Sequence, residues 1–531
     1  AIGYEALENQ NSDTTNYNVA VGFQAGRSIT TGTGNTISGG LAGSSMDTGF
    51  ANQLFGFEAG LSLTDADYNV AIGYEALDAD VKGNRAIAIG HAALGSQSFS
   101  TSTDNYNIGI GFQAGTAVTT GLKNTIIGGL AGDAITDADF NVVVGFQALS
   151  TNSVGSASVA IGTSALENQN PATATDMHNV AVGHSAGQAV TTGQYNTLLG
   201  GLAGDALTSS NNNIAIGYQA LTTDTQGTKT VAIGIDALKN QNHTTNTDTY
   251  NVAMGYHAGR DVTTGIRNTI LGSLAADALT TGGRNVSLGY AAHSADTLGS
   301  RSVAIGYEAL GTQNFTTATD NYNIGIGYSA GNVLTTGTNN IFIGGLAGDA
   351  TTDADDNVAV GMQALSTNTL GSASTAIGKD ALHDQNPATA TLMYNVAVGY
   401  HAGRLISTGV KNVIVGALAG DTLTTGERNV YVGHTSGDRA TIGTFNTGVG
   451  AETLFMNVAG NKNTAVGEAA LFAMTAATST DTLNTAVGFN SASAVTSGVQ
   501  NTIVGALAGD ALTTGNYNTS VGVNALTTDT T

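Results

Sequence analysis

Residues 18–27 read NVAVGFQAGR, residues 357–365 read NVAVGMQAL, and residues 395–404 read NVAVGYHAGR. The glycine that follows the apolar triplet of this phrase, here called the anchor glycine, occurs in 30 repeat units between Gly3 and Gly522. Most anchor glycines lie 17 residues apart, and a spacing of 21 usually follows three spacings of 17. A super-repeat of 72 residues therefore connects Gly90, Gly162, Gly234, Gly306 and Gly378. A short period that is kept along a whole chain is typical of repeat architectures.

The residues before each anchor predict short β-strands, because they are β-branched runs bounded by Gly, Asn, Asp and Thr. Seventeen residues are too few for two helices with their turns, but they suffice for one coil of a β-solenoid. We therefore predict an all-β fold, a parallel β-solenoid or β-roll of about 30 coils, with 17-residue coils and a 21-residue coil about every fourth. Residues 1–531 would form one continuous rod segment, and its first and last repeat phrases are cut short, as expected for part of a longer chain.

The composition excludes several classes of protein. The chain has 73 Gly, 2 Pro and no Cys, and 41% of its residues are hydrophobic, which favours a folded chain without disulfides or thiolate metal sites. The formal net charge of −23 disfavours a nucleic-acid partner, because little positive charge is available to neutralise phosphates. No apolar run approaches the roughly 20 residues of a membrane helix, so we expect no membrane insertion of this segment. No signal peptide is visible at Ala1.

A column of asparagines predicts contacts between coils. Four residues before the anchor, Asn occurs in 24 of the 29 units that include this position. Stacked Asn side chains form hydrogen-bonded ladders and also tolerate turn geometry. The five exceptions lie 72 residues apart and are Ala86, Ser158, Thr230, Ser302 and Ser374. We predict that such a structural ladder includes Asn268, Asn285, Asn323, Asn340 and Asn357.

The central strand of the repeat is apolar on both sides. In V-A-V the two valines share one face and the alanine has the other. We expect the valines to fill the coil interior and the alanines to face outward, where only another packed surface would keep them dry. A second copy of the chain is the simplest such surface, so we predict a homo-oligomer, a trimer, with Ala160, Ala232 and Ala304 in its interface. In the NTIIGGLAG units, a large residue replaces this alanine and a small one follows the anchor, which suggests that both share one packed space.

The 21-residue spacings add four residues to a loop that reads roughly Gln-Asn-x-x-Thr-x-Thr-Asp-x-Tyr-Asn. Such loops should protrude, and aromatic rings with amides could contact cell-surface glycans or neighbouring fibres. The structural alternative is that the tyrosine covers the loop base and the rest is a solvated turn. The candidate contact residues are Tyr17, Tyr106, Tyr250, Tyr322, Tyr394, Gln97, Gln169, Gln241 and Gln313.

Other chemistry has weaker support. GGLAGDA, as in residues 128–134, resembles a calcium-binding repeat, but one Asp per site is few for an ion that takes six to eight oxygens. Calcium stays an alternative to a turn whose Asp accepts backbone hydrogen bonds, and we expect no other cofactor. No Ser-His-Asp set, unique carboxylate pair or P-loop stands out, and an enzyme needs a singular constellation. We therefore expect no enzyme.

The phrase at residues 158–162 and 302–306, SVAIG, resembles the head repeats of YadA-type trimeric autotransporter adhesins. The form at residues 463–467, NTAVG, is similar to repeats of phage tail fibres and of bacterial surface proteins with an endosialidase-type chaperone domain. These resemblances cover nearly the whole chain. They imply a surface-exposed parallel β-roll in which three chains form a rod.

The function predicted from the sequence is a structural rod of an extracellular fibre or surface adhesin. It would space or attach a cell or virion to its target. One alternative is an adhesive module that binds glycans through the protruding loops. Another is a polysaccharide-degrading tail spike, whose cleft would need two carboxylates about 5 to 10 Å apart.

Overall fold

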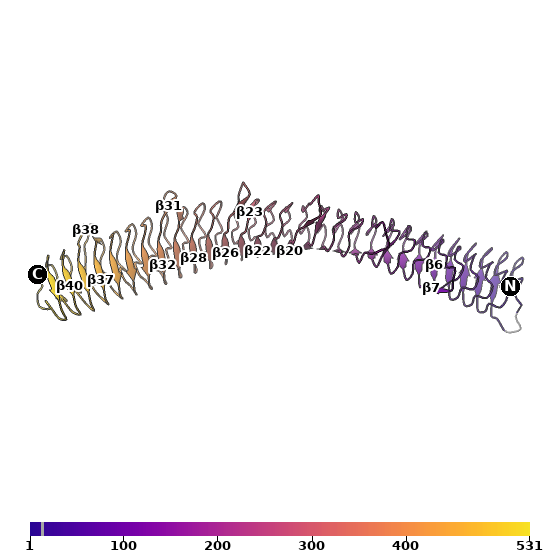
Figure 1. The fold of residues 1–531 in the computed structure, drawn as a ribbon, viewed down its shortest axis with the longest axis horizontal. Coiled ribbons are helices and arrows are strands. Elements are labelled where there is room, and N and C mark those ends of the chain that lie inside the picture. Colours follow the sequence, from indigo (N-terminus) through magenta and orange to yellow (C-terminus); the bar gives the residue numbers. More distant parts are fainter. Residues whose placement is uncertain (12–14) are drawn as a thin grey trace. The chain divides into compact units, whose positions relative to one another are not determined.

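A computed structural model describes residues 1–11 and 15–531. Its regular elements are all β-strands, and none of the described residues is helical. By its internal contacts the chain divides into two compact units, Ala1–Arg267 and Asn268–Thr531. Each unit is a stack of coils in which the strands of successive coils lie side by side (Figure 1). The prediction of an all-β parallel solenoid is confirmed, and its successive strands follow the spacing of the anchor glycines.

Each coil contributes one three-residue strand, which ends at the residue before the anchor glycine, and these strands pair in parallel. In unit 1, β12 pairs β14 with Ala160 opposite Ala181, so that equivalent residues of successive coils are in register. The strands of unit 1 are β1 (Val19–Val21), β2 (Thr36–Ser38), β3 (Gln53–Phe55), β4 (Val70–Ile72), β6 (Ile87–Ile89), β8 (Ile108–Ile110), β9 (Thr125–Ile127), β10 (Val142–Val144), β12 (Val159–Ile161), β14 (Val180–Val182), β15 (Thr197–Leu199), β16 (Ile214–Ile216), β18 (Val231–Ile233) and β20 (Val252–Met254).

Unit 2 repeats this arrangement, and β24 pairs β26 with Ala304 opposite Gly325. The strands of unit 2 are β21 (Thr269–Leu271), β22 (Val286–Leu288), β24 (Val303–Ile305), β26 (Ile324–Ile326), β27 (Ile341–Ile343), β28 (Val358–Val360), β30 (Thr375–Ile377), β32 (Val396–Val398), β33 (Val413–Val415), β34 (Val430–Val432), β35 (Thr447–Val449), β37 (Thr464–Val466), β39 (Thr485–Val487), β40 (Thr502–Val504) and β41 (Thr519–Val521).

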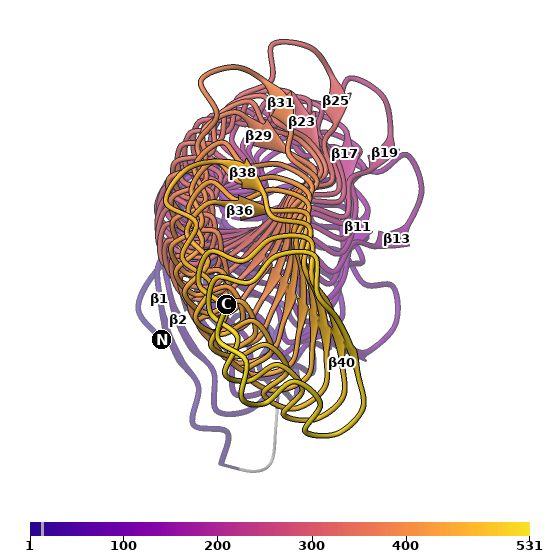
Figure 2. The same ribbon diagram turned by 90° about the vertical axis from the view of Figure 1, so that its left-hand side faces the viewer.

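The long coils add pairs of two-residue strands that are also parallel. They are β5 (Gly83–Asn84) with β7 (Thr103–Asp104), β11 (Gly155–Ser156) with β13 (Thr175–Asp176), β17 (Gly227–Thr228) with β19 (Thr247–Asp248), β23 (Gly299–Ser300) with β25 (Thr319–Asp320), β29 (Gly371–Ser372) with β31 (Thr391–Leu392), and β36 (Gly460–Asn461) with β38 (Thr480–Asp481). The loops before β13, β19, β25 and β31 project beyond the coils next to them (Figure 2), as the four added residues predict.

The asparagine column forms hydrogen bonds along the stack. In unit 2 the Asn357 backbone N–H donates to Asn340 Oδ1 at 3.1 Å, and the Asn340 N–H donates to Asn323 Oδ1 at 2.9 Å. Each side-chain amide also donates to a carbonyl of the next coil, for example Asn340 Nδ2 to Ala354 O at 2.8 Å. These asparagines are fully buried, so each one satisfies backbone groups that water cannot reach. The same bonds connect Asn268 to Asn285 and Asn285 to Ser302.

Removal of one ladder member is expected to cost about 1–3 kcal/mol, because it leaves buried groups without a partner. Asn340→Ala and Asn357→Ala should each show this loss in the free energy of opening their coils, measured by amide hydrogen exchange. The double variant should lose less than the sum, because the two residues share one bond. Asn314→Ala, on an exposed loop, is the control. If the two losses add strictly, each asparagine stabilises only its own turn, and the ladder is refuted.

Candidate functional site

The structure reverses the predicted inside and outside of the main strands. Ala160, Ala232 and Ala304 are 0% exposed within the single chain, so they lie in the coil interior and cannot form an oligomer contact. The flanking β-branched residues instead point outward and are partly exposed, as Val303 and Ile305 are. In the coils with alanine, the interior has room for little more than a methyl group at this position, because buried Leu, Val and Asn side chains from the rest of the coil already fill it.

The exchange of large and small residues has a different cause from the one predicted. In the NTIIGGLAG units the large residue, such as Ile126 or Phe342, is fully buried inside the coil. The small residue after the anchor lies outside: a Cβ on Gly129 would be 3.6 Å from the Phe146 ring of the next coil. The two positions therefore occupy opposite sides of the strand. The inner space for the large residue comes from glycines four residues after the anchor, in its own coil and in the coil before. Cβ atoms on Gly348 and on Gly331 would lie 2.5 Å and 2.7 Å from the Phe342 ring.

The predicted glutamine contacts are also corrected. Gln97, Gln169, Gln241 and Gln313 are 0% exposed, so they cannot contact a glycan or another fibre. Gln313 Nε2 donates to Ser302 Oγ at 2.9 Å, and Gln313 Oε1 accepts from Asn323 Nδ2 at 2.9 Å. Since Ser302 stands where the ladder lacks an asparagine, the glutamine side chain spans that gap in the ladder.

The tyrosines of the same loops are on the surface. The exposed fractions of Tyr106, Tyr250, Tyr322 and Tyr394 are 49–50%, and that of Tyr17 is 78%. Several of them have a cation from the preceding coil beside the ring. Arg301 CZ lies 5.4 Å from the centre of the Tyr322 ring, and Lys229 Nζ lies 5.1 Å from that of Tyr250. Of the candidate residues for contact with glycans or other fibres, only the tyrosines therefore remain.

Unit 2 contains a Ser-His-Asp arrangement that the sequence reading missed. Ser287 Oγ lies 3.3 Å from His293 Nδ1, and His293 Nε2 lies 2.9 Å from Asp296 Oδ2. Burial alone would raise the pKa of Asp296, but hydrogen bonds from His293, Gln313 and the Gly299 N–H outweigh it and lower the pKa. All three members of the arrangement are 0% exposed, so a substrate cannot reach the serine. The set acts as a satisfied polar network inside the coil.

The signal for this network was present in the sequence. Ser287 replaces the alanine that fills this inward position in most coils, and Asp296 precedes the turn at Gly299 by three residues. The same Asp position recurs at Asp80 and Asp224, each within 2.6 Å of a buried glutamine Nε2. Burial raises the pKa of Asp80, which has no histidine beside it. Asn152, Asn368 and Asn457 take this place before the other long coils, and each accepts the same hydrogen bond from the N–H of the glycine three residues later. The position therefore needs an oxygen acceptor, which Asp or Asn supplies.

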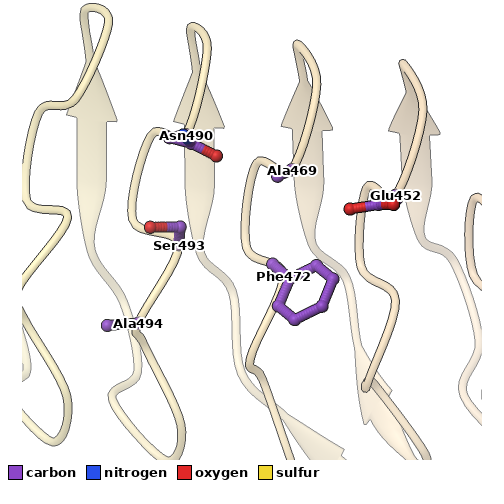
Figure 3. A pocket seen from close by; sticks show the side chains of 6 residues that line it. All are labelled: Glu452, Ala469, Phe472, Asn490, Ser493 and Ala494. Carbon is purple, nitrogen blue, oxygen red and sulfur yellow. The ribbon is translucent and has the colours of Figure 1, made fainter.

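A shallow hollow of about 340 Å³ opens on the outside of unit 2 (Figure 3). Three of its residues lie two positions after successive anchors, and the short Ala469 between Glu452 and Asn490 creates the space. Phe472 forms one wall, and its ring stacks on Phe455 with the ring centres 5.1 Å apart. Ser493 and Ala494 complete the lining. The lining has a single carboxylate, whereas glycoside hydrolysis ordinarily uses two.

Residues 1–11 and 15–531 contain neither a cluster of metal-ligating side chains nor a membrane-spanning helix. No group of three or more His, Asp or Glu side chains there could hold a metal ion. In the GGLAGDA phrase, burial raises the pKa of Asp133. Asp205, at the equivalent place, accepts a hydrogen bond from the Thr222 hydroxyl of the next coil. In the same part of the chain no helix has the length and hydropathy that a membrane span requires.

Comparison of the chain with protein-family models, with curated proteins and with solved structures finds no match.

Proposed function

We propose that this chain is a structural rod segment of an extracellular fibre or surface adhesin, and that it works as a homo-oligomer, a trimer. The observation that supports this most is the outer face of the main strands. The third residue of every main strand except β2 is apolar and lies on this face, and the first residue is Val or Ile in 18 of the 29 strands. Ile72, Ile214, Leu288 and Ile377 are examples, and their exposed fractions are 37–40%. A monomeric soluble protein rarely exposes a continuous apolar surface larger than a few hundred Å².

The aromatic residues that follow the anchors extend this face. Tyr290, Tyr307 and Tyr328 lie on three successive coils, and each ring centre is 5.4 Å from the next. Their exposed fractions are 48%, 44% and 60%. Rings that stack along the coils present a flat, rigid apolar edge beside the strands. Copies of the same chain are the partner favoured here, because an apolar third strand residue recurs in nearly every coil and a second copy offers a matching row.

The mechanical function follows from the construction. Each coil bonds to the next through strand pairing and through the buried asparagines, so a load along the stack is shared by many parallel bonds. The resemblance to trimeric adhesin heads and tail-fibre repeats supports the same proposal. A rod of this kind spaces or attaches a cell or virion to its target.

The outer face can be tested with charges at one equivalent position in three successive super-repeats. Ile161→Asp, Ile233→Asp and Ile305→Asp, made together, should convert the oligomer to monomer, because three carboxylates per chain would enter an apolar contact. Sedimentation equilibrium measures the mass, and far-UV circular dichroism checks that the β-structure is retained. The matched control has the same three charges at the loop residues Thr173, Thr245 and Thr317, which are exposed. A wild-type monomer, or an unchanged mass in the isoleucine variant, would refute the proposal.

Glycan contact at the exposed tyrosines is a second candidate function. The observation that favours it is the position of Tyr106, Tyr250, Tyr322 and Tyr394, which follow projecting loops and are half exposed. Loss of binding to a glycan array on Tyr→Ala substitution at these positions, with unchanged oligomeric mass, is the expected result.

A further inference from the structure

The residue five positions before each anchor lies at a corner of the coil, here called the outer corner. It has a left-handed backbone wherever it is not glycine, with φ of 61° at Lys411 and 58° at Arg428. Nine of the outer-corner residues are Lys or Arg, although the whole chain has 16 such cations, and ten are Tyr or Phe. The cations are Arg85, Lys123, Lys229, Arg267, Arg284, Arg301, Lys411, Arg428 and Lys462. The rings are Tyr17, Tyr68, Tyr106, Phe140, Tyr195, Tyr250, Tyr322, Tyr394, Phe445 and Tyr517.

Backbone geometry does not explain this choice of residues. A left-handed φ favours Gly, Asn and Asp and disfavours β-branched residues. The corner contains no Val, Ile or Thr, as expected, but it has only Gly34, Asn212, Asn339 and Asp356 from the favoured group. The preference for cations and rings must therefore come from what these side chains contact.

Contacts within the chain account for part of the preference. In unit 1, Arg85 lies between two rings, 5.1 Å from the centre of Tyr68 and 5.7 Å from that of Tyr106, and its Nε is 3.0 Å from Asp104 Oδ2. Such cation–π and ionic contacts between neighbouring coils stabilise the stack. They leave Arg85 with a partner on every side, whereas Lys123, among the described residues, has a ring contact alone, 5.1 Å from the centre of Phe140.

Unit 2 has the same arrangement at Arg301, which lies between Asp320 and the Tyr322 ring, but a later stretch of the unit lacks it. Five successive coils carry Tyr394, Lys411, Arg428, Phe445 and Lys462 at the outer corner, and all five are exposed. Lys411 and Arg428 are neighbours, at a coil spacing of about 4.8 Å, where like charges repel. Among the residues that the structure describes, neither forms an ion pair with a carboxylate. A contact with the Phe445 ring offsets part of this repulsion at Arg428, but among the described residues Lys411 has neither a carboxylate nor a ring that would offset it.

The other charges near these residues are few. Glu427 precedes Arg428 in the chain and is half-buried. Lys462 Nζ is 2.6 Å from Asp481 Oδ2. Arg428 CZ lies 5.0 Å from the centre of the Phe445 ring, so a ring and a cation form one edge of the surface. Tyr394 borders the other end of the pair and directly follows the projecting loop that leads into β31.

We propose that the outer corner of unit 2 from Tyr394 to Lys462 binds an extended acidic polysaccharide. Lys411 and Arg428 would pair with its carboxylates, and Tyr394 and Phe445 would stack on its sugar rings. A sugar in an extended polysaccharide advances by about as much as one coil, so successive sugars would meet successive coils. This proposal rests on the second candidate function, glycan contact, and specifies its ligand.

The small number of free cations favours a polysaccharide over a nucleic acid. Nucleic-acid binding depends on the neutralisation of many phosphates, whereas the corner from Tyr394 to Lys462 has two cations without a carboxylate partner among the described residues, on a chain of net charge −23. A polysaccharide also offers flat sugar faces to Tyr394 and Phe445, so that its binding does not depend on charge alone.

The test measures binding of the full chain to polygalacturonate, to neutral dextran and to a single-stranded oligonucleotide. Lys411→Gln with Arg428→Gln should weaken polygalacturonate binding by about tenfold or more, since two charge-assisted contacts are lost. Lys379→Gln with Arg439→Gln removes the same charges from exposed positions outside the corner and should change the affinity less than about twofold. Circular dichroism and the melting temperature check that both variants fold.

Each outcome is decisive. Tighter binding of polygalacturonate than of dextran, lost only in the corner variant, supports the proposal. Equal losses in the two variants would show that only net charge matters and would overturn it. Equal binding of dextran and polygalacturonate would overturn the acidic ligand but keep glycan contact. Absence of binding to both would reject glycan contact as well, and preferential binding of the oligonucleotide would replace the polysaccharide with a nucleic acid.

Discussion

Ala304→Asp is expected to open the coils around Gly306, while Val303→Asp, one residue earlier on the same strand, leaves them folded. Ala304 is 0% exposed and lies in the interior, whereas Val303 points outward. A carboxylate at residue 304 would have neither water nor a partner, and an uncompensated buried charge costs about 3–5 kcal/mol. Val303→Asp adds the same charge to a surface that water reaches in the single chain.

Amide hydrogen exchange is the suitable measurement, because each coil mainly contacts its neighbours and can open without unfolding the whole chain. Protection should fall for residues 289–327 in Ala304→Asp and remain near the wild-type level in Val303→Asp. The reverse pattern would restore the original expectation that the alanines face outward.

Gly344→Ala should have the second large effect, and Gly345→Ala should have almost none. The anchor Gly344 has φ of +132°, and a Cβ there would lie 2.5 Å from Gly361 O of the next coil. Strained backbone and a clash with main-chain atoms together should cost about 3 kcal/mol or more. A Cβ on Gly345 would meet no atom within 4 Å.

Thermal melting and hydrogen exchange of the coils before and after residue 344 compare the two variants. Gly345→Ala should stay within about 1 kcal/mol of wild type, in either direction. A similar small change for both variants would show that the coils can separate enough to admit a methyl group. Steric clash with the next coil would then not explain why the anchor residue is glycine.

The sequence predicted the coil, its period, the place of the strand and the asparagine ladder, because each of these depends on spacing. It could not decide which side of V-A-V faces inward. Alternation shows only that Val303 and Ile305 share a face opposite Ala304. Which side faces inward depends on how much of the interior the other side chains of the coil fill. That volume follows from the three-dimensional path of the closed coil and not from the strand sequence.

The prediction that the glutamines lie on the surface was wrong for a related reason. Gln313 lies beside exposed Thr and Asn residues in the sequence, which is typical of a solvated loop. Its burial depends on Asp296 in the coil before it and Asn323 in the coil after it. Partners that lie in neighbouring coils leave no local pattern in the sequence. The exposure of the loop tyrosines was easier to predict, because they lie at a left-handed turn on the corner of the coil, where a large ring cannot enter the interior.

The glutamine that spans the ladder has a consequence for how such a chain can change its length. Deletion of residues 307–378 would join Gly306 to Lys379, and Ser302 would then meet Gln385, which already bonds to Ser374 at 3.0 Å. Ser302 would therefore again lie beside a glutamine, as it now lies beside Gln313. A gene that gains or loses this segment by unequal recombination therefore encodes a shorter or longer stack with intact joints, whereas loss of the segment that contains Gln313 alone would leave Ser302 without its glutamine. The length of the stack can thus change in steps of four coils with every ladder serine still beside a glutamine.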